Sequence, residues 1–392
     1  MSNALNWNTI DLSTIKDDPN VGIKIATEIE RLSWIKSPFA SFTGKGADRG
    51  VRQYSVENDQ PYRPRLKSKL TGDGVVGNAD LETNYDTLEI LNQTIYPRVI
   101  ANALKSQIRQ YDMMRKIDFA KESTSSLGEW VQDKRDKAIV AHLCNDFTNA
   151  VVCDKDKGYK DFDKNIQTTA KSIIAGDVMN VKALRRAIFM ARAGLGANGK
   201  EAFPIKPIKA DLESAHGLSI QHNSYIILLE SHQANQLKAD QEWKDMQIHA
   251  GERGDKNALF TGLLGMIDGC PVLDMGVWTK LQVGMPNSDV SDEDFKKNID
   301  MQNITKLTPP SYYTGAQSIS IGALIGASAI VMAGSDKVNF YINENEDSGR
   351  KIVCGVDRLL SVAKGRFALE SGSLSAFSNQ DFAVIGLFSS KE

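Results

Sequence analysis

The chain has 392 residues; 41% are apolar and 24% are charged, and 47 Lys and Arg against 49 Asp and Glu leave a net charge of −2. This composition is typical of a globular protein and excludes a disordered or fibrous chain. The near-neutral charge also argues against a surface that clamps a nucleic-acid backbone, which usually needs a strong basic excess. At about 150 residues per domain, the length predicts two or three lobes.

Neither a membrane nor a disulfide framework is expected. The longest uncharged run has an apolar centre at residues 319–333, which is shorter than the ~20 residues that span a bilayer. The four cysteines form no Cys-x-x-Cys pair, and this pattern is typical of reduced thiols in a cytosolic compartment. The N-terminal residues lack the apolar segment with basic flanks that marks a secretion signal.

Residues 1–50 are predicted to form an N-terminal arm that contains one helix. Asp18 can cap this helix, and Pro19 suits its first position. Ile25 and Ile29 belong to an apolar stripe with helical spacing, and the sequence at Pro38 ends the pattern.

Residues 51–100 are predicted to form an extended, charged β-hairpin loop. Four cations alternate with other residues, a period of two that places them on one face of a strand: Arg63, Arg65, Lys67 and Lys69. Residues 71–90 then contain Asp and Glu but neither Lys nor Arg; three of these acids are Glu82, Asp86 and Glu89. Two interpretations stay open: a solvated hairpin held by cross-strand charge pairs, or an arm whose seven named charges contact a neighbouring subunit.

The remainder of the chain predicts a long helix followed by mixed elements. Residues 101–149 have few helix breakers, which indicates one long helix or two with a weak point at 123–126. A second helix is expected from a cap at Asp177 to Gly194 or Gly196, and a third from a cap at Ser231, directly after a buried strand at 225–229. Further strands are expected at 271–275 and in the tail, after a long polar connection at 284–318. This order is that of an α+β protein.

The search for catalytic chemistry finds no convincing site. Residues 194–200 have the spacing of a phosphate-binding loop, but Glu201 stands where Ser or Thr should hold magnesium, and a helix precedes the glycines where a strand should. No histidine belongs to a tight metal-ligand set, and no serine or cysteine has the local signature of a nucleophile. We therefore expect no catalytic residue, no cofactor and no metal, and a structural role.

Several phrases, in their order along the chain, resemble a known family. The turn-rich segment and the helix that follows contribute Leu70, Gly72, Gly74, Val75, Gly77, Leu81, Glu82, Leu127, Trp130 and Asp136. The later phrases contribute Gln233, Leu237, Asp240, Trp243, Gly365, Arg366 and Phe367. Over roughly residues 65–390, this pattern resembles the major capsid proteins of tailed bacteriophages, specifically the N-four-like branch.

The resemblance implies the Hong Kong 97-like capsid fold, with an N-terminal arm (1–50) and an extended β-hairpin loop (51–100). It further implies a peripheral domain with a spine helix (101–165), an axial domain (166–336) and closing strands that return to the peripheral domain (337–392). The small-residue run at 322–329 is expected either to permit close helix packing or to be a plain core helix.

The function that the resemblance implies is assembly. Copies would form pentamers and hexamers of an icosahedral shell around double-stranded DNA. The expected location is the virion capsid, which would be assembled in the host cytoplasm. A scaffolding protein and a portal are expected partners, and a decoration protein could dock on residues 284–318. The DNA would be contacted weakly and without sequence specificity. Two alternatives stay open: an encapsulin-like nanocompartment shell, and an enzyme of unrecognised class.

Overall fold

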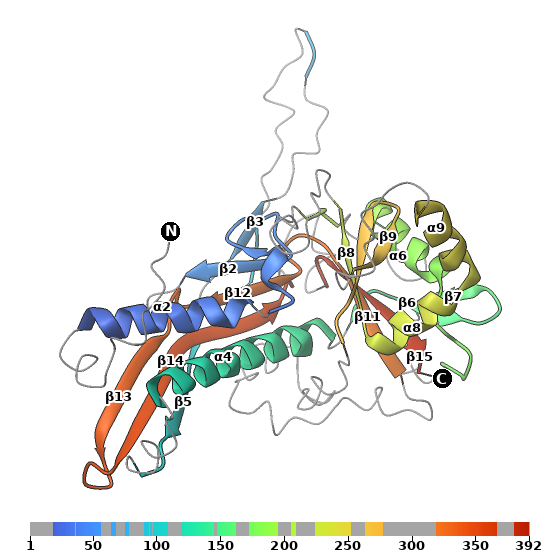
Figure 1. Ribbon diagram of the computed structural model, residues 1–392. Coiled ribbons are helices and arrows are strands. Elements are labelled where there is room, and N and C mark those ends of the chain that lie inside the picture. Colours follow the sequence, from blue (N-terminus) through green and yellow to red (C-terminus); the bar gives the residue numbers. More distant parts are fainter. Residues whose placement is uncertain are drawn as a thin grey trace.

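The computed structural model describes residues 19–35, 37–55, 64–67, 75–77, 90–93, 95, 97–108, 119–144, 147–161, 172–194, 205–208, 224–251, 263–276, 319–366 and 380–391. Among these residues, two large sheets organise the molecule and lie on either side of it, as Figure 1 shows. The long β13–β14 hairpin extends at one end, and the helices α6, α8 and α9 gather at the other.

The first sheet has six strands, in the order β1-β2-β12-β14-β13 with β5 also paired to β14. Their bounds are β1 Thr43–Gly44, β2 Val51–Ser55, β5 Arg98–Lys105, β12 Ile330–Gly334, β13 Asn339–Glu346 and β14 Lys351–Lys364. A short 3-10 helix, η2 (Ala40–Phe42), precedes β1. The strand β14 is long enough to pair with β12 near its end and with β13 and β5 nearer its start.

Two helices cover one face of this first sheet: α2 (Pro19–Ile35) and α4 (Phe119–Cys144). Their apolar residues and those of the sheet form a shared cluster that includes Ile25, Ile29, Leu127, Val131, Cys354 and Val356. Burial of these side chains is the main force that holds the helices on the sheet, at roughly 25 cal/mol per Å² of apolar surface.

The second sheet has seven strands, in the order β7-β6-β15-β11-β8-β10-β9. Their bounds are β6 Ala150–Asp154, β7 Gly158–Asp161, β8 Ile226–Leu229, β9 Leu263–Ile267, β10 Cys270–Asp274, β11 Ile319–Ile325 and β15 Val384–Ser390. The associated helices are α6 Val181–Ala193, α8 Ser231–Ala239 and α9 Gln241–Gly251. Every residue of β8, β11 and β15 is buried, as expected for central strands covered on both faces.

One apolar core joins the two sheets. The cluster combines residues of the first sheet with residues of the second, among them Val51, Met332, Leu360, Ile227, Leu324 and Ile385. A separate two-stranded ribbon pairs β3 (Arg65–Lys67) antiparallel with β4 (Ile90–Asn92). Among the described residues, no helix is long and apolar enough to cross a membrane.

Several predicted elements are confirmed. The first helix begins at Pro19 and ends before Ser37, and a helix follows the buried strand β8. The predicted cap of this later helix is off by one residue, because Glu230 is the N-cap and Ser231 is the first helical residue. The strand at 270–274 and the tail strands β13, β14 and β15 also form as expected. In these places the sequence carries strong local signals, such as a proline at a helix start or a short apolar run between turns.

Three expectations were wrong. The long helix does not begin at residue 101: residues 98–105 form β5, and α4 begins at Phe119 and runs without a break through 123–126, where Ser123 and Thr124 are buried. The helix expected to start from Asp177 is α6, which Asn180 caps by accepting a hydrogen bond from the Ala183 amide. The run at 322–329 is not helical, because it comprises the end of β11 and the turn into β12.

Each sheet combines strands from more than one of the predicted segments. The strands β6 and β7, placed with the spine helix, and β15, placed among the closing strands, all lie in the seven-stranded sheet. The strand β12, placed in the axial domain, lies in the six-stranded sheet. The chain therefore passes between the two sheets several times.

Candidate functional site

The structure describes only part of the charged extension. Arg65 and Lys67 lie two positions apart in β3, and β3 pairs with β4 in the register Arg65↔Asn92, Leu66↔Leu91 and Lys67↔Ile90. An antiparallel ribbon at this position agrees with the predicted hairpin. The other proposed contact residues lie outside the described residues: Arg63, Lys69, Glu82, Asp86 and Glu89.

The base of this ribbon is fixed to the protein body by Gln93, the residue after β4. The Gln93 backbone N–H donates to the Pro64 carbonyl at 3.3 Å, which closes the ribbon at its base. The side-chain amide of Gln93 donates to the Lys364 carbonyl at 2.7 Å, and its oxygen accepts from the Arg366 backbone N–H at 3.2 Å. Gln93 is only 4% exposed, so water competes little for these bonds.

The residues that Gln93 contacts also belong to a buried ion cluster. The Asp381 carboxylate accepts from Lys364 Nζ at 2.8 Å and from Arg366 Nε at 2.8 Å. Thr148, in the segment between α4 and β6, adds two bonds: its backbone N–H donates to the Asp381 carboxylate at 3.0 Å, and its hydroxyl accepts from the Asp381 backbone N–H at 2.8 Å. The cluster therefore joins the end of β14 to the approaches of β6 and β15.

Burial and charge act in opposite directions on the groups of this cluster. Burial raises the pKa of Asp381, but Arg366 and Lys364 outweigh burial, so its pKa lies below the ordinary value of 3.8. His142 of α4 is fully buried, and burial together with the nearby Lys364 charge lowers its pKa to about 3. The Lys364 ammonium also lies 4.2 Å from the centre of the Phe147 ring. The cluster is thus charged at neutral pH, while His142 is neutral.

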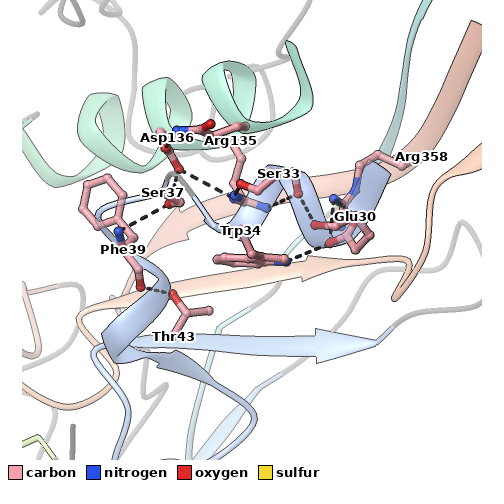
Figure 2. A network of polar contacts seen from close by, with 10 residues as sticks. Glu30, Ser33, Trp34, Ser37, Phe39, Thr43, Arg135, Asp136 and Arg358 are labelled. Carbon is pink, nitrogen blue, oxygen red and sulfur yellow. Dashed lines mark hydrogen bonds and ion pairs between the residues drawn. The ribbon is translucent and has the colours of Figure 1, made fainter. Parts of the chain in front are cut away.

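A second polar network holds α2 on the spine helix α4 (Figure 2). Arg135 of α4 is fully buried, and its guanidinium donates to the Ser33 carbonyl at 2.5 Å and to the Ser33 hydroxyl at 3.2 Å. Its guanidinium carbon lies 3.4 Å from the centre of the Trp34 ring. Because Ser33 is in the last turn of α2, Arg135 places a positive charge at the negative end of that helix. Burial lowers the pKa of Arg135 to about 10, although Asp136 opposes this effect.

The same network continues on both sides of Arg135. The Ser37 hydroxyl donates to Asp136 at 2.8 Å, directly after α2 ends. On the other side, Glu30 of α2 accepts from Trp34 Nε1 at 2.8 Å and from Arg358 of β14 at 3.0 Å. Figure 2 shows these residues in one continuous row between α2, α4 and β14. The first helix is therefore fixed to both the spine helix and the sheet.

Several residues that carried the resemblance have a structural explanation. The buried Gln233 amide donates to the Ser320 and Leu387 carbonyls, each at 3.1 Å, and so joins α8 to two central strands. The Asp240 carboxylate accepts from the backbone N–H groups of Val181 at 2.8 Å and Glu242 at 3.2 Å, at the starts of α6 and α9. These residues, like Asp136 and Arg366, position elements relative to one another.

Sequence reasoning did not single out Gln93, Arg135, Lys364 or Asp381. A single glutamine or arginine in a sequence carries no signal of its burial, because burial depends on partners that lie up to 273 residues away, as in the Gln93–Arg366 bond. Among the described residues, no three His, Cys, Asp or Glu side chains are arranged to hold a metal ion. The chemistry of the region is that of rigid attachment: two buried charged networks fix an arm helix and the base of a charged ribbon on one body.

The described part of the chain is thus an α+β body that carries the two-stranded ribbon β3–β4, held at its base by the buried Gln93. A family model described as phage capsid protein matches residues 62–390. The chain is 47% identical over 399 residues to the "Major structural protein ORF14" of Helicobacter pylori bacteriophage KHP30, with 98% of this chain and 99% of that protein covered. The chain belongs to the phage capsid protein family.

Solved structures agree with this assignment. The head structure of Helicobacter pylori bacteriophage KHP40 matches with a TM-score of 0.73 and 48% identity over 100% of both chains. The acidic stable capsid structure of bacteriophage KHP30 matches with a TM-score of 0.72 and 47% identity over 98% and 99% of the two chains. The capsid of Ralstonia phage GP4 shares the fold, with a TM-score of 0.62 at 16% identity over 91% and 92% of the chains.

These findings confirm three expectations from the sequence: an α+β capsid fold, the function of a bacteriophage major capsid protein, and a place in the virion capsid. They do not favour the nanocompartment alternative, because the relatives that are 47–48% identical over the whole chain are phage proteins.

Proposed function

We propose that copies of this chain form the pentamers and hexamers of an icosahedral shell that encloses double-stranded DNA. The observation that carries this proposal is the similarity, at 47–48% identity and over nearly the full length of both chains, to proteins solved in a phage head and a phage capsid. Shell assembly takes place in the host cytoplasm, with a scaffolding protein and a portal as partners. The role is structural and includes no catalytic step.

The charged ribbon contacts a neighbouring subunit in this proposal. Three features support this role: the alternating cations of residues 63–69, the acidic segment that follows, and the fixed base at Gln93. Each exposed ion pair contributes only about 0–1 kcal/mol, but every subunit repeats the contact around a closed shell. Such charges select the partner and its register more than they raise affinity.

The near-neutral net charge of −2 suits a shell that holds DNA with weak, non-specific contacts, because tight phosphate binding needs many Lys and Arg. A decoration protein would dock on residues 284–318. The predicted division into an arm (1–50), a loop (51–100), a peripheral domain (101–165), an axial domain (166–336) and closing strands (337–392) forms part of the same proposal.

The experiment that tests the ribbon contact is charge removal followed by assembly. The variant replaces Arg63, Arg65, Lys67 and Lys69 with Ser. A matched control replaces four exposed cations on the helices α2, α4, α8 and α9: Lys24, Lys121, Lys238 and Lys244. We expect the ribbon variant to assemble into far fewer shells than the wild type. The difference in shell yield should shrink as the salt concentration rises, because salt screens the ion pairs of the wild type. Equal shell yields for both variants would contradict the contact.

A further inference from the structure

The short segment at the end of β14 is bonded on every side, and one of its partners is a side chain. The Gly365 N–H donates to the Ala329 carbonyl at 2.8 Å, and the Gly365 carbonyl accepts from the Phe382 N–H at 2.9 Å. The Lys364 carbonyl and the Arg366 N–H point the other way and are bonded by Gln93. In a sheet, these two groups would be bonded by one residue of a neighbouring strand.

The Gln93 carboxamide therefore takes the place of a strand residue. It supplies one N–H donor and one C=O acceptor, the same pair that a peptide backbone supplies. The backbone of Gln93 meanwhile donates to Pro64, so one residue joins both strands of the ribbon to the protein body. No other residue type of similar length offers this combination, because Glu has no donor at neutral pH and Met has neither group.

We infer that Gln93 is a positioning residue that sets the direction in which the charged ribbon leaves the body, and thereby the geometry of its contact with the neighbouring subunit. This inference rests on the proposed function. The bond to Arg366 connects the ribbon base to the Asp381 ion cluster, since the Arg366 side chain is held by Asp381. Because the Gln93 side chain is bonded to the main chain of Lys364 and Arg366, the base of the ribbon is attached directly to the two-sheet core.

The geometry explains why a small change at the base matters. Each residue of an extended strand adds about 3.3 Å, so a rotation at the base produces a displacement that grows along the predicted loop. Charge contacts between subunits depend on atoms that approach to about 4 Å. Loss of the Gln93 bonds thus weakens assembly even though the ribbon keeps all of its charges.

The test compares Gln93→Met, Gln93→Glu and the wild type, with two controls. Gln241→Met removes an exposed glutamine of α9 and controls for the substitution itself. Leu237→Ala removes a buried side chain of the helix α8, which packs against the seven-stranded sheet, and controls for a loss of stability that leaves the ribbon base intact. Shell yield is measured by sedimentation, at equal concentrations of folded subunit and with the scaffolding protein present.

Two results are expected from Gln93→Met. Hydrogen exchange of the Arg366 amide in the unassembled subunit becomes at least about fivefold faster, because its N–H loses the Gln93 side-chain acceptor. Shell yield falls at least about tenfold. This fall is larger than that of Leu237→Ala when the two variants are compared at equal concentrations of folded subunit. Gln241→Met behaves as the wild type in both measurements.

Gln93→Glu adds a signature that a merely structural role would not produce. At pH 7 its carboxylate lacks the donor for the Lys364 carbonyl, but the protonated carboxyl has both a donor and an acceptor. The ratio of its shell yield to that of the wild type should therefore rise as the pH falls from about 7 to about 5. Gln93→Met has no titrating group and should show no such rise.

The outcomes separate this inference from the proposed function. Suppose that the wild type forms shells. The inference alone would then be overturned if Gln93→Met gave the same shell yield as the wild type, or if its loss of yield were no larger than that of Leu237→Ala. A flat Gln93→Glu ratio across the pH range would overturn it as well. Failure of the wild type itself to form shells would overturn the proposed function and the inference together.

Discussion

The guanidinium of Arg135 lies over the Trp34 indole ring, with 3.4 Å between the guanidinium carbon and the ring centre. The same guanidinium donates to the Ser33 carbonyl. One side chain of the spine helix thus binds both the last turn and the aromatic face of the arm helix. Because Arg135 is fully buried, water cannot take the place of either partner if it is lost.

Replacement of Arg135 by Met should destabilise the unassembled subunit by about 3–5 kcal/mol, the range for breaking a buried ion pair. The loss has two parts: the Ser33 carbonyl loses a donor, and Asp136 loses its positive neighbour. Arg135→Lys should recover only part of this loss, since an ammonium lacks the planar fork. Urea unfolding of the unassembled subunit measures both values.

The control for this prediction is Lys137→Met, two residues further along α4. Lys137 pairs with Asp133 at the surface, so its replacement should cost no more than about 1 kcal/mol. Similar losses for Arg135→Met and Lys137→Met would contradict the central place of Arg135 in the network.

Replacement of Asp381 by Asn should also destabilise the subunit by about 3–5 kcal/mol at pH 7, because Lys364 and Arg366 lose the buried carboxylate between them. The effect depends on pH. The folded-state pKa lies below the ordinary 3.8, so the stabilisation is fully present above that value and is lost as the pH falls through the lower folded-state pKa.

The pH series therefore has a predicted shape. The difference in unfolding free energy between the wild type and Asp381→Asn should be constant from neutral pH down to about 5 and then narrow in more acidic solution. A difference that stays constant into strong acid would show that the Asp381 charge does not produce the stabilisation.

His142 produces linkage of the same sign, over a different pH range, because its folded-state pKa also lies below its ordinary value. Its folded-state pKa is about 3, against an ordinary value of 6.5. Between these two values the unfolded chain binds a proton that the folded protein excludes, so stability falls as the pH falls, by up to about 1.4 kcal/mol per pH unit. His142→Gln should remove this component from the pH dependence of urea unfolding.

A second histidine provides the control. His232→Gln replaces an exposed histidine of α8 and tests for the loss of a histidine as such. If His142→Gln and His232→Gln leave the same pH dependence between about 6.5 and about 4, burial of His142 is not the cause of the acid sensitivity.

Gly322 of β11 permits a close approach between a strand and the elements beside it. A Cβ atom added at this position would lie 2.9 Å from the Leu228 carbonyl oxygen and 2.5 Å from the Gln233 side-chain oxygen. Gly322→Ala should therefore destabilise the subunit by about 1–3 kcal/mol through overpacking. A Cβ atom added at Gly22 on α2 would meet nothing within 4 Å, so Gly22→Ala should stabilise the subunit by up to about 1 kcal/mol. Thermal unfolding measures both changes in stability, and changes of the same sign for the two substitutions would refute this explanation.

Local signals in the sequence were sufficient where an element depends on its own residues. The helix that begins at Pro19 and the strand 226–229 with the helix after it were both predicted, because a proline at a helix start and an apolar run before a serine are strong cues. The charged ribbon was predicted from its period of two, and the described pairing of β3 with β4 agrees with it.

Elements that depend on distant partners were not predictable in this way. Residues 98–105 have a composition that suits a helix, but they pair along their whole length with β14, about 250 residues later in the chain. The run that contains Gly322 was expected to be helical, but Gly322 belongs to the central strand β11, close to the Leu228 carbonyl and the Gln233 side chain. The buried charges of Arg135 and Asp381 are recognisable only once the fold supplies their partners.

Assembly of the purified subunit is the most direct test of the central claim. Negative-stain electron microscopy and sedimentation velocity are carried out on the wild-type protein, alone and with a scaffolding protein of the same phage. The proposed function predicts closed polyhedral shells, or the capsomers and tubes that precede them, in at least one of the two samples. A compact monomer or dimer in both samples, at every concentration tested, would contradict the assignment of this chain as a self-assembling shell subunit.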